Sequence, residues 1–93
     1  MKYILVKWKH HDPRDPVLIY SEIDGEQWEH RKVEVFSDGR LGFADQNHEV
    51  GGSRLAIEPW PDLAKLGAEP EFYISEITAA EFEAIWQKAT RQQ

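Results

Sequence analysis

The sequence predicts an α+β domain, in which an antiparallel β-sheet meander of four or five strands carries a C-terminal α-helix packed on one face. Three observations lead to this class. Alternating or β-branched segments fill the first half of the chain, turn dipeptides separate them, and the final segment has helical periodicity. The 93 residues, 41% of them hydrophobic, can bury one modest core. We therefore expect a single domain over residues 1–93.

Four segments have the pattern of strands. Residues 3–9 alternate, with Ile4, Val6 and Trp8 directed to the core. The two prolines of "DPRDP" then break regular structure. The other strands are expected at residues 17–23, 28–36 and 40–44, after turns at residues 12–16, 24–25 and 38–39.

The Asp38-Gly39 turn sets the expected register of the third and fourth strands. A two-residue turn would place Val35 opposite Gly42 and Val33 opposite Ala44. These four residues would form a shallow strip on which another element could pack. The opposite face would mix large aromatic side chains with charges.

The second half of the chain has weaker patterns until its end. Residues 45–54 are expected to form a loop or irregular edge, residues 55–57 a short strand, and residues 61–67 one or two helical turns between a proline and a glycine. A closing helix is expected over residues 79–90.

The evidence for the closing helix is a capping box and an apolar stripe. Thr78 and Glu81 have capping-box spacing. The apolar residues that recur at i, i+3, i+4 and i+7 are Phe82, Ile85, Trp86 and Ala89. We expect this stripe to pack on the strip of the third and fourth strands.

Charge and composition exclude several classes of protein. The formal net charge of −6 repels a phosphate backbone, so no nucleic-acid partner is expected. The chain has no cysteine for disulfides, thiolate metal sites or nucleophilic catalysis, which fits the cytoplasm. No apolar run is long enough to span a membrane. The same acidity favours a basic protein as partner.

"KWKHHDPRDP", residues 7–16, is the strongest candidate for a metal or acid-base site. His10 and His11 are adjacent at the end of a strand, so their side chains point to opposite faces and do not converge on one ion. The prolines favour a turn in which aspartates accept hydrogen bonds from nearby backbone amides. We expect no tight metal site and no cofactor.

Signatures of nucleophilic catalysis are absent from the sequence. No serine lies in G-x-S-x-G, and "VGGSR", residues 50–54, lacks the lysine of a phosphate-binding loop. The chain is therefore not expected to be an enzyme. A small enzyme or metal-binding protein that uses His10, His11 and nearby carboxylates is the alternative, and a self-associating structural domain is a third.

Several stretches together resemble an uncharacterised family of small, stand-alone bacterial proteins that carries a domain-of-unknown-function label. They are "KYILVKWKH", "DPVLIYSEID", "RKVEVFSDG", "GGSRL" and the Phe82 to Trp86 spacing. This resemblance implies a bacterial, single-domain, soluble protein and assigns no catalytic residue. By type, the chain is also similar to the immunity partners of bacterial toxins.

The leading hypothesis is a protein-binding module, specifically a cytoplasmic immunity protein that neutralises a toxin domain by occluding it. Occlusion needs a rigid scaffold, an aromatic anchor and complementary charge, but no catalytic groups. The predicted contact surface surrounds the turn between the second and third strands. It comprises Glu22, Asp24, Glu26, Trp28, Glu29, His30 and Glu34.

Overall fold

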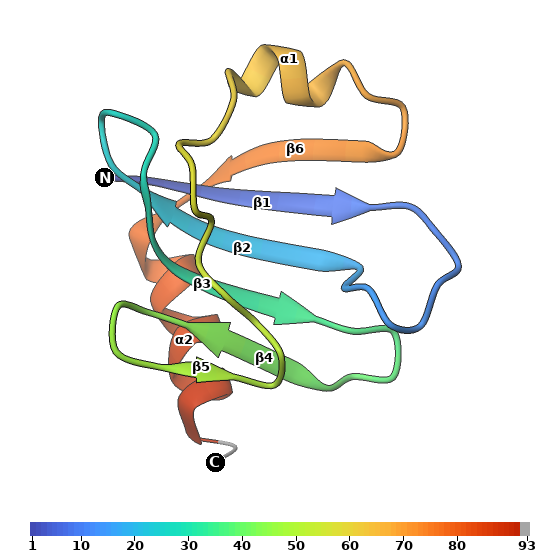
Figure 1. The fold of residues 1–93 in the computed structure, drawn as a ribbon, viewed down its shortest axis with the longest axis vertical. Helices are drawn as coiled ribbons and strands as arrows, with labels where there is room; N and C mark the ends of the chain where they lie inside the picture. The colour runs from blue at the N-terminus through green and yellow to red at the C-terminus, as the bar shows by residue number, and fades with distance from the viewer. Residues whose placement is uncertain (92–93) are drawn as a thin grey trace.

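The computed structural model describes residues 1–91, which form one six-stranded antiparallel sheet and two helices (Figure 1). The spatial order of the strands is β5-β4-β3-β2-β1-β6. The elements are β1 (Lys2–Trp8), β2 (Leu18–Ile23), β3 (Glu29–Val35), β4 (Leu41–Ala44), β5 (Glu49–Val50), α1 (Leu63–Gly67), β6 (Phe72–Ile77) and α2 (Ala79–Arg91). The predicted α+β class is thus confirmed. Neither helix is long and apolar enough to cross a membrane.

The second half of the chain differs most from the prediction. The short strand expected at residues 55–57 is wrong, because no strand forms there. Two other strands appear instead: β5, and β6, which pairs with β1 at the edge of the sheet. The segment "FYISEI" of β6 alternates, but the residues of β1 that pair with it lie 64 to 74 positions earlier in the chain, so no local turn predicts the pairing.

The predicted register of β3 and β4 is also wrong, because the turn between them has three residues rather than two. Phe36 accepts a hydrogen bond from the Gly39 amide and donates one to the carbonyl of Arg40, both at 2.9 Å. Gly39 takes a φ of 91°, which a glycine adopts without steric cost. The extra residue pairs Val33 with Phe43 and Glu34 with Gly42.

This shift of one residue moves Gly42 and Ala44 to the face opposite Val33. They therefore do not form the strip on which the helix was expected to pack. Gly42 is instead covered by the chain that follows β5, and a Cβ atom built on it would lie 2.3 Å from the hydroxyl oxygen of Ser53. The absence of a side chain allows this close approach.

Helix α2 packs on one side of the sheet, here called the helix face. Its capping box is confirmed: Glu81 N–H donates to Thr78 Oγ1 at 3.1 Å, and Thr78 N–H donates to Glu81 Oε1 at 3.0 Å. Phe82 is completely buried beside the ring of Tyr3, at 5.4 Å between centroids. Trp86 meets Phe43 edge-on at 5.3 Å. The stripe predicted from the sequence thus packs on the sheet, where Val33 is a neighbour as expected and Phe43 takes the place expected for Gly42 and Ala44.

The opposite side of the sheet is covered by residues 51–62, here called the strap, and by α1. The strap runs diagonally across the sheet from β5 to α1 (Figure 1). Beneath it and α1, Ile4, Val6 and Ile23 form a buried cluster, against which pack Ile19, Trp60, Leu63, Phe72 and Ile74. Helix α1 begins after Asp62, whose side chain accepts a hydrogen bond from the Ala64 amide at 2.8 Å. This side is called the strap face.

The different burial of Phe82 and Trp86 on α2 predicts different losses of stability when each is replaced by alanine. Phe82→Ala should lower the free energy of unfolding by about 3–5 kcal/mol, because the ring is fully buried. Trp86→Ala should cost less, about 2–3 kcal/mol, because part of the indole remains exposed. Urea denaturation of both variants measures the two losses. Equal losses, or an unchanged midpoint for Phe82→Ala, would contradict this packing.

Candidate interaction site

The seven residues that were predicted to form one contact surface lie in three different places of the fold. Glu22 lies on the helix face, whereas Glu29 and Glu34 lie on the strap face. The remaining four surround the turn between β2 and β3: Asp24, Glu26, Trp28 and His30. The predicted residues therefore do not form one continuous surface.

Glu22 fastens the helix to the sheet. Its carboxylate accepts two hydrogen bonds from Arg31, at 2.9 and 2.7 Å, and Arg31 also donates to Glu83 of α2 at 2.5 Å. The guanidinium lies about 5 Å from the ring centroids of Phe82 and Trp86. Bonding to Arg31 holds the pKa of Glu22 below its usual value. This carboxylate serves internal packing rather than contact with a partner.

Glu29 fastens the strap to the sheet, and its side chain is fully buried. Its Oε2 accepts hydrogen bonds from Ser21 Oγ at 2.7 Å and from the indole N–H of Trp60 at 3.2 Å. Its Oε1 accepts one from the Ala56 amide at 2.8 Å and lies 3.2 Å from Lys32 Nζ. Four donors on two oxygens meet the requirement for burying a charged carboxylate.

A bulge explains why Glu29 reaches the strap face. The pairing of β2 with β3 shifts between Glu22 and Ile23, so that Glu29 lies opposite Ile23. Simple alternation along β3 would have placed Glu29 on the helix face with Val33. Glu34 lies further along the strap face, where it accepts a hydrogen bond from Ser53 Oγ at 2.6 Å. This bond fastens the start of the strap.

Asp24 fixes the conformation of the β2–β3 turn. Its Oδ1 accepts hydrogen bonds from the amides of Glu26 and Trp28, at 2.8 and 3.0 Å, and its Oδ2 contacts His30 Nε2 at 2.8 Å. The bond to His30 is the main reason that the pKa of Asp24 lies below its usual value. The turn projects an exposed Glu26 and a Trp28 that is 42% exposed.

The strap lies directly beside this turn. The amide of Trp60 donates to the carbonyl of Gln27 at 2.8 Å, and Ala56 is bonded to Glu29. Between these two anchors, Glu58 is exposed and Ile57 is 92% exposed. Two apolar and two acidic side chains thus stand on neighbouring, fixed segments. We call this set the turn–strap surface: Glu26, Trp28, Ile57 and Glu58.

Sequence reasoning found the turn half of this surface but missed the strap half. The only signal for Ile57 was a large apolar residue followed directly by "EPWP", a stretch that holds the chain extended. The expected strand at residues 55–57 concealed this signal, because a strand would have directed alternate side chains inward. Trp60 is half-buried, and its indole donates a hydrogen bond to Glu29, a contact that no local pattern indicates.

The His10–His11 stretch forms the turn that the prolines predicted. His10 Nε2 lies 2.7 Å from the Pro16 carbonyl, and its Nδ1 accepts a hydrogen bond from the Asp12 amide at 3.0 Å. These partners require the neutral Nε2–H form and occupy both ring nitrogens. Asp12 in turn accepts a hydrogen bond from the Arg14 amide at 2.9 Å. Within residues 1–91, no group of three potential ligands is arranged to hold a metal.

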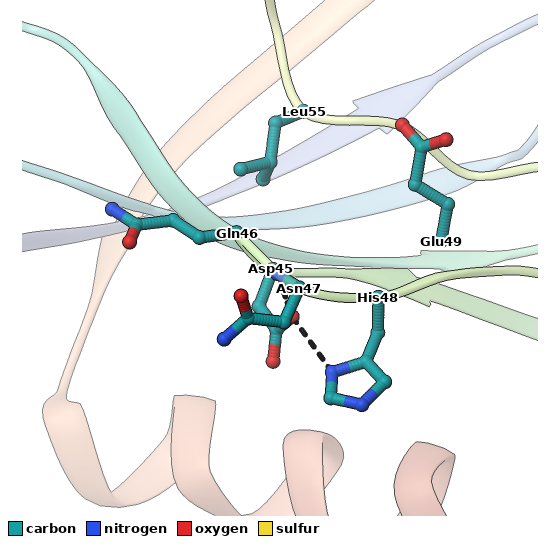
Figure 2. A pocket seen from close by; sticks show the side chains of 6 residues that line it. All are labelled: Asp45, Gln46, Asn47, His48, Glu49 and Leu55. Carbon is teal, nitrogen blue, oxygen red and sulfur yellow. Dashed lines mark hydrogen bonds and ion pairs between the residues drawn. The ribbon is translucent and has the colours of Figure 1, made fainter.

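A second Asp–His pair lies at the turn between β4 and β5. Asp45 Oδ1 accepts a hydrogen bond from the Asn47 amide at 2.8 Å and lies 2.9 Å from His48 Nδ1 (Figure 2). Burial raises the pKa of Asp45, but these bonds outweigh it and leave the pKa below its usual value. The open hollow around the pair is lined by Asp45, Gln46, Asn47, His48, Glu49 and Leu55. This lining has no hydroxyl or thiol nucleophile for the pair to activate.

The bonds of Glu29 predict the effect of removing its charge. Glu29→Gln places an amide NH₂ against donors, so at least one buried donor loses its partner. We expect a loss of about 2–3 kcal/mol in unfolding free energy. We also expect faster hydrogen exchange at the Ala56 amide and the Trp60 indole, measured by NMR. Glu58→Gln, an exposed strap residue, is the control. Equal exchange rates in both variants would contradict the fastening role of Glu29.

Gln27 predicts an opposite effect on stability. It takes a φ of 71° at the third position of the β2–β3 turn, the place that Gly39 occupies in the β3–β4 turn. Because a side chain is strained there, Gln27→Gly should raise the unfolding free energy by about 0.5–1 kcal/mol. Gly39→Gln is the reciprocal control and should lower it. Thermal and urea denaturation test both, and a less stable Gln27→Gly would show that the long 3.4 Å bond from Gln27 Nε2 to the Pro61 carbonyl outweighs the strain.

Comparison with known proteins gives a family and no function. Searches of curated proteins and of solved structures find no match. A family model described as Domain of unknown function (DUF6881) matches residues 2–91, almost the whole chain. This match confirms the resemblance to an uncharacterised family. The chain therefore belongs to the DUF6881 family.

Proposed function

We propose that this protein is a binding module for a basic protein and, specifically, a cytoplasmic immunity protein that occludes a bacterial toxin domain. The observation that carries the proposal is the turn–strap surface, in which Trp28 and Ile57 are exposed on segments held by internal hydrogen bonds. A large apolar side chain on a backbone that is already fixed requires no ordering of the backbone on binding. Trp28 would be the central anchor.

Charge supports a basic partner. The chain carries a formal net charge of −6, and both polar members of the turn–strap surface, Glu26 and Glu58, are acidic and exposed. Exposed acids at the rim of an interface accelerate encounter with a basic protein more than they strengthen the complex. The same field disfavours nucleic acid, so none is proposed as a partner.

The proposal assigns no reaction to the chain. Of the candidate groups for acid-base chemistry, His10 uses both ring nitrogens within its own turn, and His30 is bonded to Asp24. A metal or substrate at His10 would have to displace one of these two bonds. These bonds of His10 and His30 support binding over the alternative, a small enzyme or metal-binding protein.

Kinetic measurements with a toxin encoded beside this gene would test the contact surface. Trp28→Ala should raise the dissociation rate at least about tenfold, because it removes a buried anchor. Glu26→Lys should mainly slow association and weaken its dependence on salt. Tyr73→Ala is the matched control, since Tyr73 is an aromatic residue that is 62% exposed on β6, away from the turn.

Growth of cells that express the toxin distinguishes the immunity function from binding alone. The parent chain should restore growth, and Trp28→Ala should restore it less well. If the parent binds the toxin without restoring growth, the immunity function is wrong although binding holds. If Tyr73→Ala weakens binding and Trp28→Ala does not, the contact surface lies elsewhere.

A further inference from the structure

Helix α2 covers only part of the helix face. In Figure 1 it passes behind one end of β1 and β2 and then behind β3 and β4, so that the rest of β1, β2 and β6 has no helix behind it. A groove of about 380 Å³ runs beside α2 at this point. Its floor is formed by Leu5, Tyr20 and Ile77, which come from those three strands. An apolar groove of this kind can accept a second structural element.

The wall of the groove is a single stripe of α2. Glu81, Ala84, Ile85 and Lys88 line it, at the i, i+3, i+4 and i+7 positions that share one face of a helix. An acidic residue stands at one end of the stripe and a basic residue at the other. The two central residues are apolar, and Ala84 is small and exposed. The stripe therefore has its own opposite charges and no net charge.

This order of residues is complementary to itself when reversed. If two copies of α2 lie antiparallel about a twofold axis between Ala84 and Ile85, Glu81 of each copy faces Lys88 of the other. Ala84 of each copy then faces Ile85 of the other, and the small side chain permits close approach of the helices. A parallel arrangement would instead place like charges together. The sequence of the stripe thus selects one orientation.

The groups at both ends of the stripe can make these contacts. Among residues 1–91, Lys88 forms no ion pair, and Glu81 uses only Oε1 in the capping box. We propose that two copies of this chain associate through antiparallel α2 helices, with the grooves beside them forming one shared apolar interface. The second copy is favoured as occupant because the stripe balances its own charges within a chain that otherwise repels its copies.

Sedimentation velocity over a series of concentrations measures this association. The parent chain should sediment as a dimer at high concentration. Lys88→Glu should weaken dimerisation at least about tenfold, because both symmetry-related contacts become repulsive. Ala84→Arg should abolish it by placing a large charged side chain at the twofold axis. Lys65→Glu makes the same change of charge on α1 and should leave dimerisation unchanged.

A mixture of two variants tests the proposed pairing directly. Glu81→Lys and Lys88→Glu should each dimerise poorly alone, but should form a heterodimer when mixed, because both contacts then join opposite charges. Circular dichroism of each variant reports whether it is folded, which matters because Glu81 also caps α2. Association of the mixture cannot arise from misfolding of either variant.

Three results would overturn the inference. The parent chain would sediment as a monomer up to millimolar concentration, Lys88→Glu would dimerise as strongly as the parent, or the mixture would not associate. Association of the parent that Trp28→Ala weakens and Lys88→Glu does not would place the contact on the turn–strap surface instead. The inference does not depend on the proposed function, since the two surfaces use different residues.

Discussion

The buried carboxylate of Glu29 is the interaction on which the rest of the strap face depends. The strap contains only irregular structure, so it cannot hold its place by backbone pairing with the sheet. Glu29 supplies the missing attachment through the Ala56 amide and the Trp60 indole. With Trp60 in place, the cluster around Ile4 is covered, and the Trp60 amide can bond to the carbonyl of Gln27. Burying an unpaired charge costs several kcal/mol, so the buried Glu29 carboxylate also needs its ion pair with Lys32 and its hydrogen bond from Ser21.

The helix face uses a similar arrangement with the charges reversed. Here Arg31 is the shared group, and it joins Glu22 of β2 to Glu83 of α2 while lying over the ring of Phe82. Each face of the sheet is therefore fastened to its cover by one charged side chain and by apolar contacts: hydrogen bonds to the Glu29 carboxylate hold the strap, and the Arg31 ion pair with Glu83 holds α2. The acidic residues predicted as one exposed cluster therefore have different roles. Glu22 and Glu29 stabilise the fold, whereas Glu26 is exposed. Glu26 of the turn and Glu58 of the strap stay exposed, and the proposed binding function depends on these two acids.

The local part of this fold was predictable from sequence, and the long-range part was not. The strands up to β4 and the capped helix α2 follow from alternation, turn residues and the Thr78–Glu81 spacing, all of which act within a few residues. The side on which Glu29 lies depends on a bulge, and the register of β4 depends on whether Gly39 is the second or third residue of its turn. At either position, a shift of one residue moves the affected side chains to the other face of the sheet. A dipeptide pattern does not contain that information.

The arrangement of the two proposed surfaces has a consequence for binding. The stripe of α2 lies on the helix face, whereas Ile57 and Glu58 belong to the strap on the other side of the sheet. A dimer that pairs the helix faces would therefore leave both turn–strap surfaces open. Such a dimer would present two equivalent sites related by a twofold axis, and each could engage a partner without displacing the other copy. Self-association and partner binding are thus compatible in one molecule, because the sheet separates the side chains on which each depends.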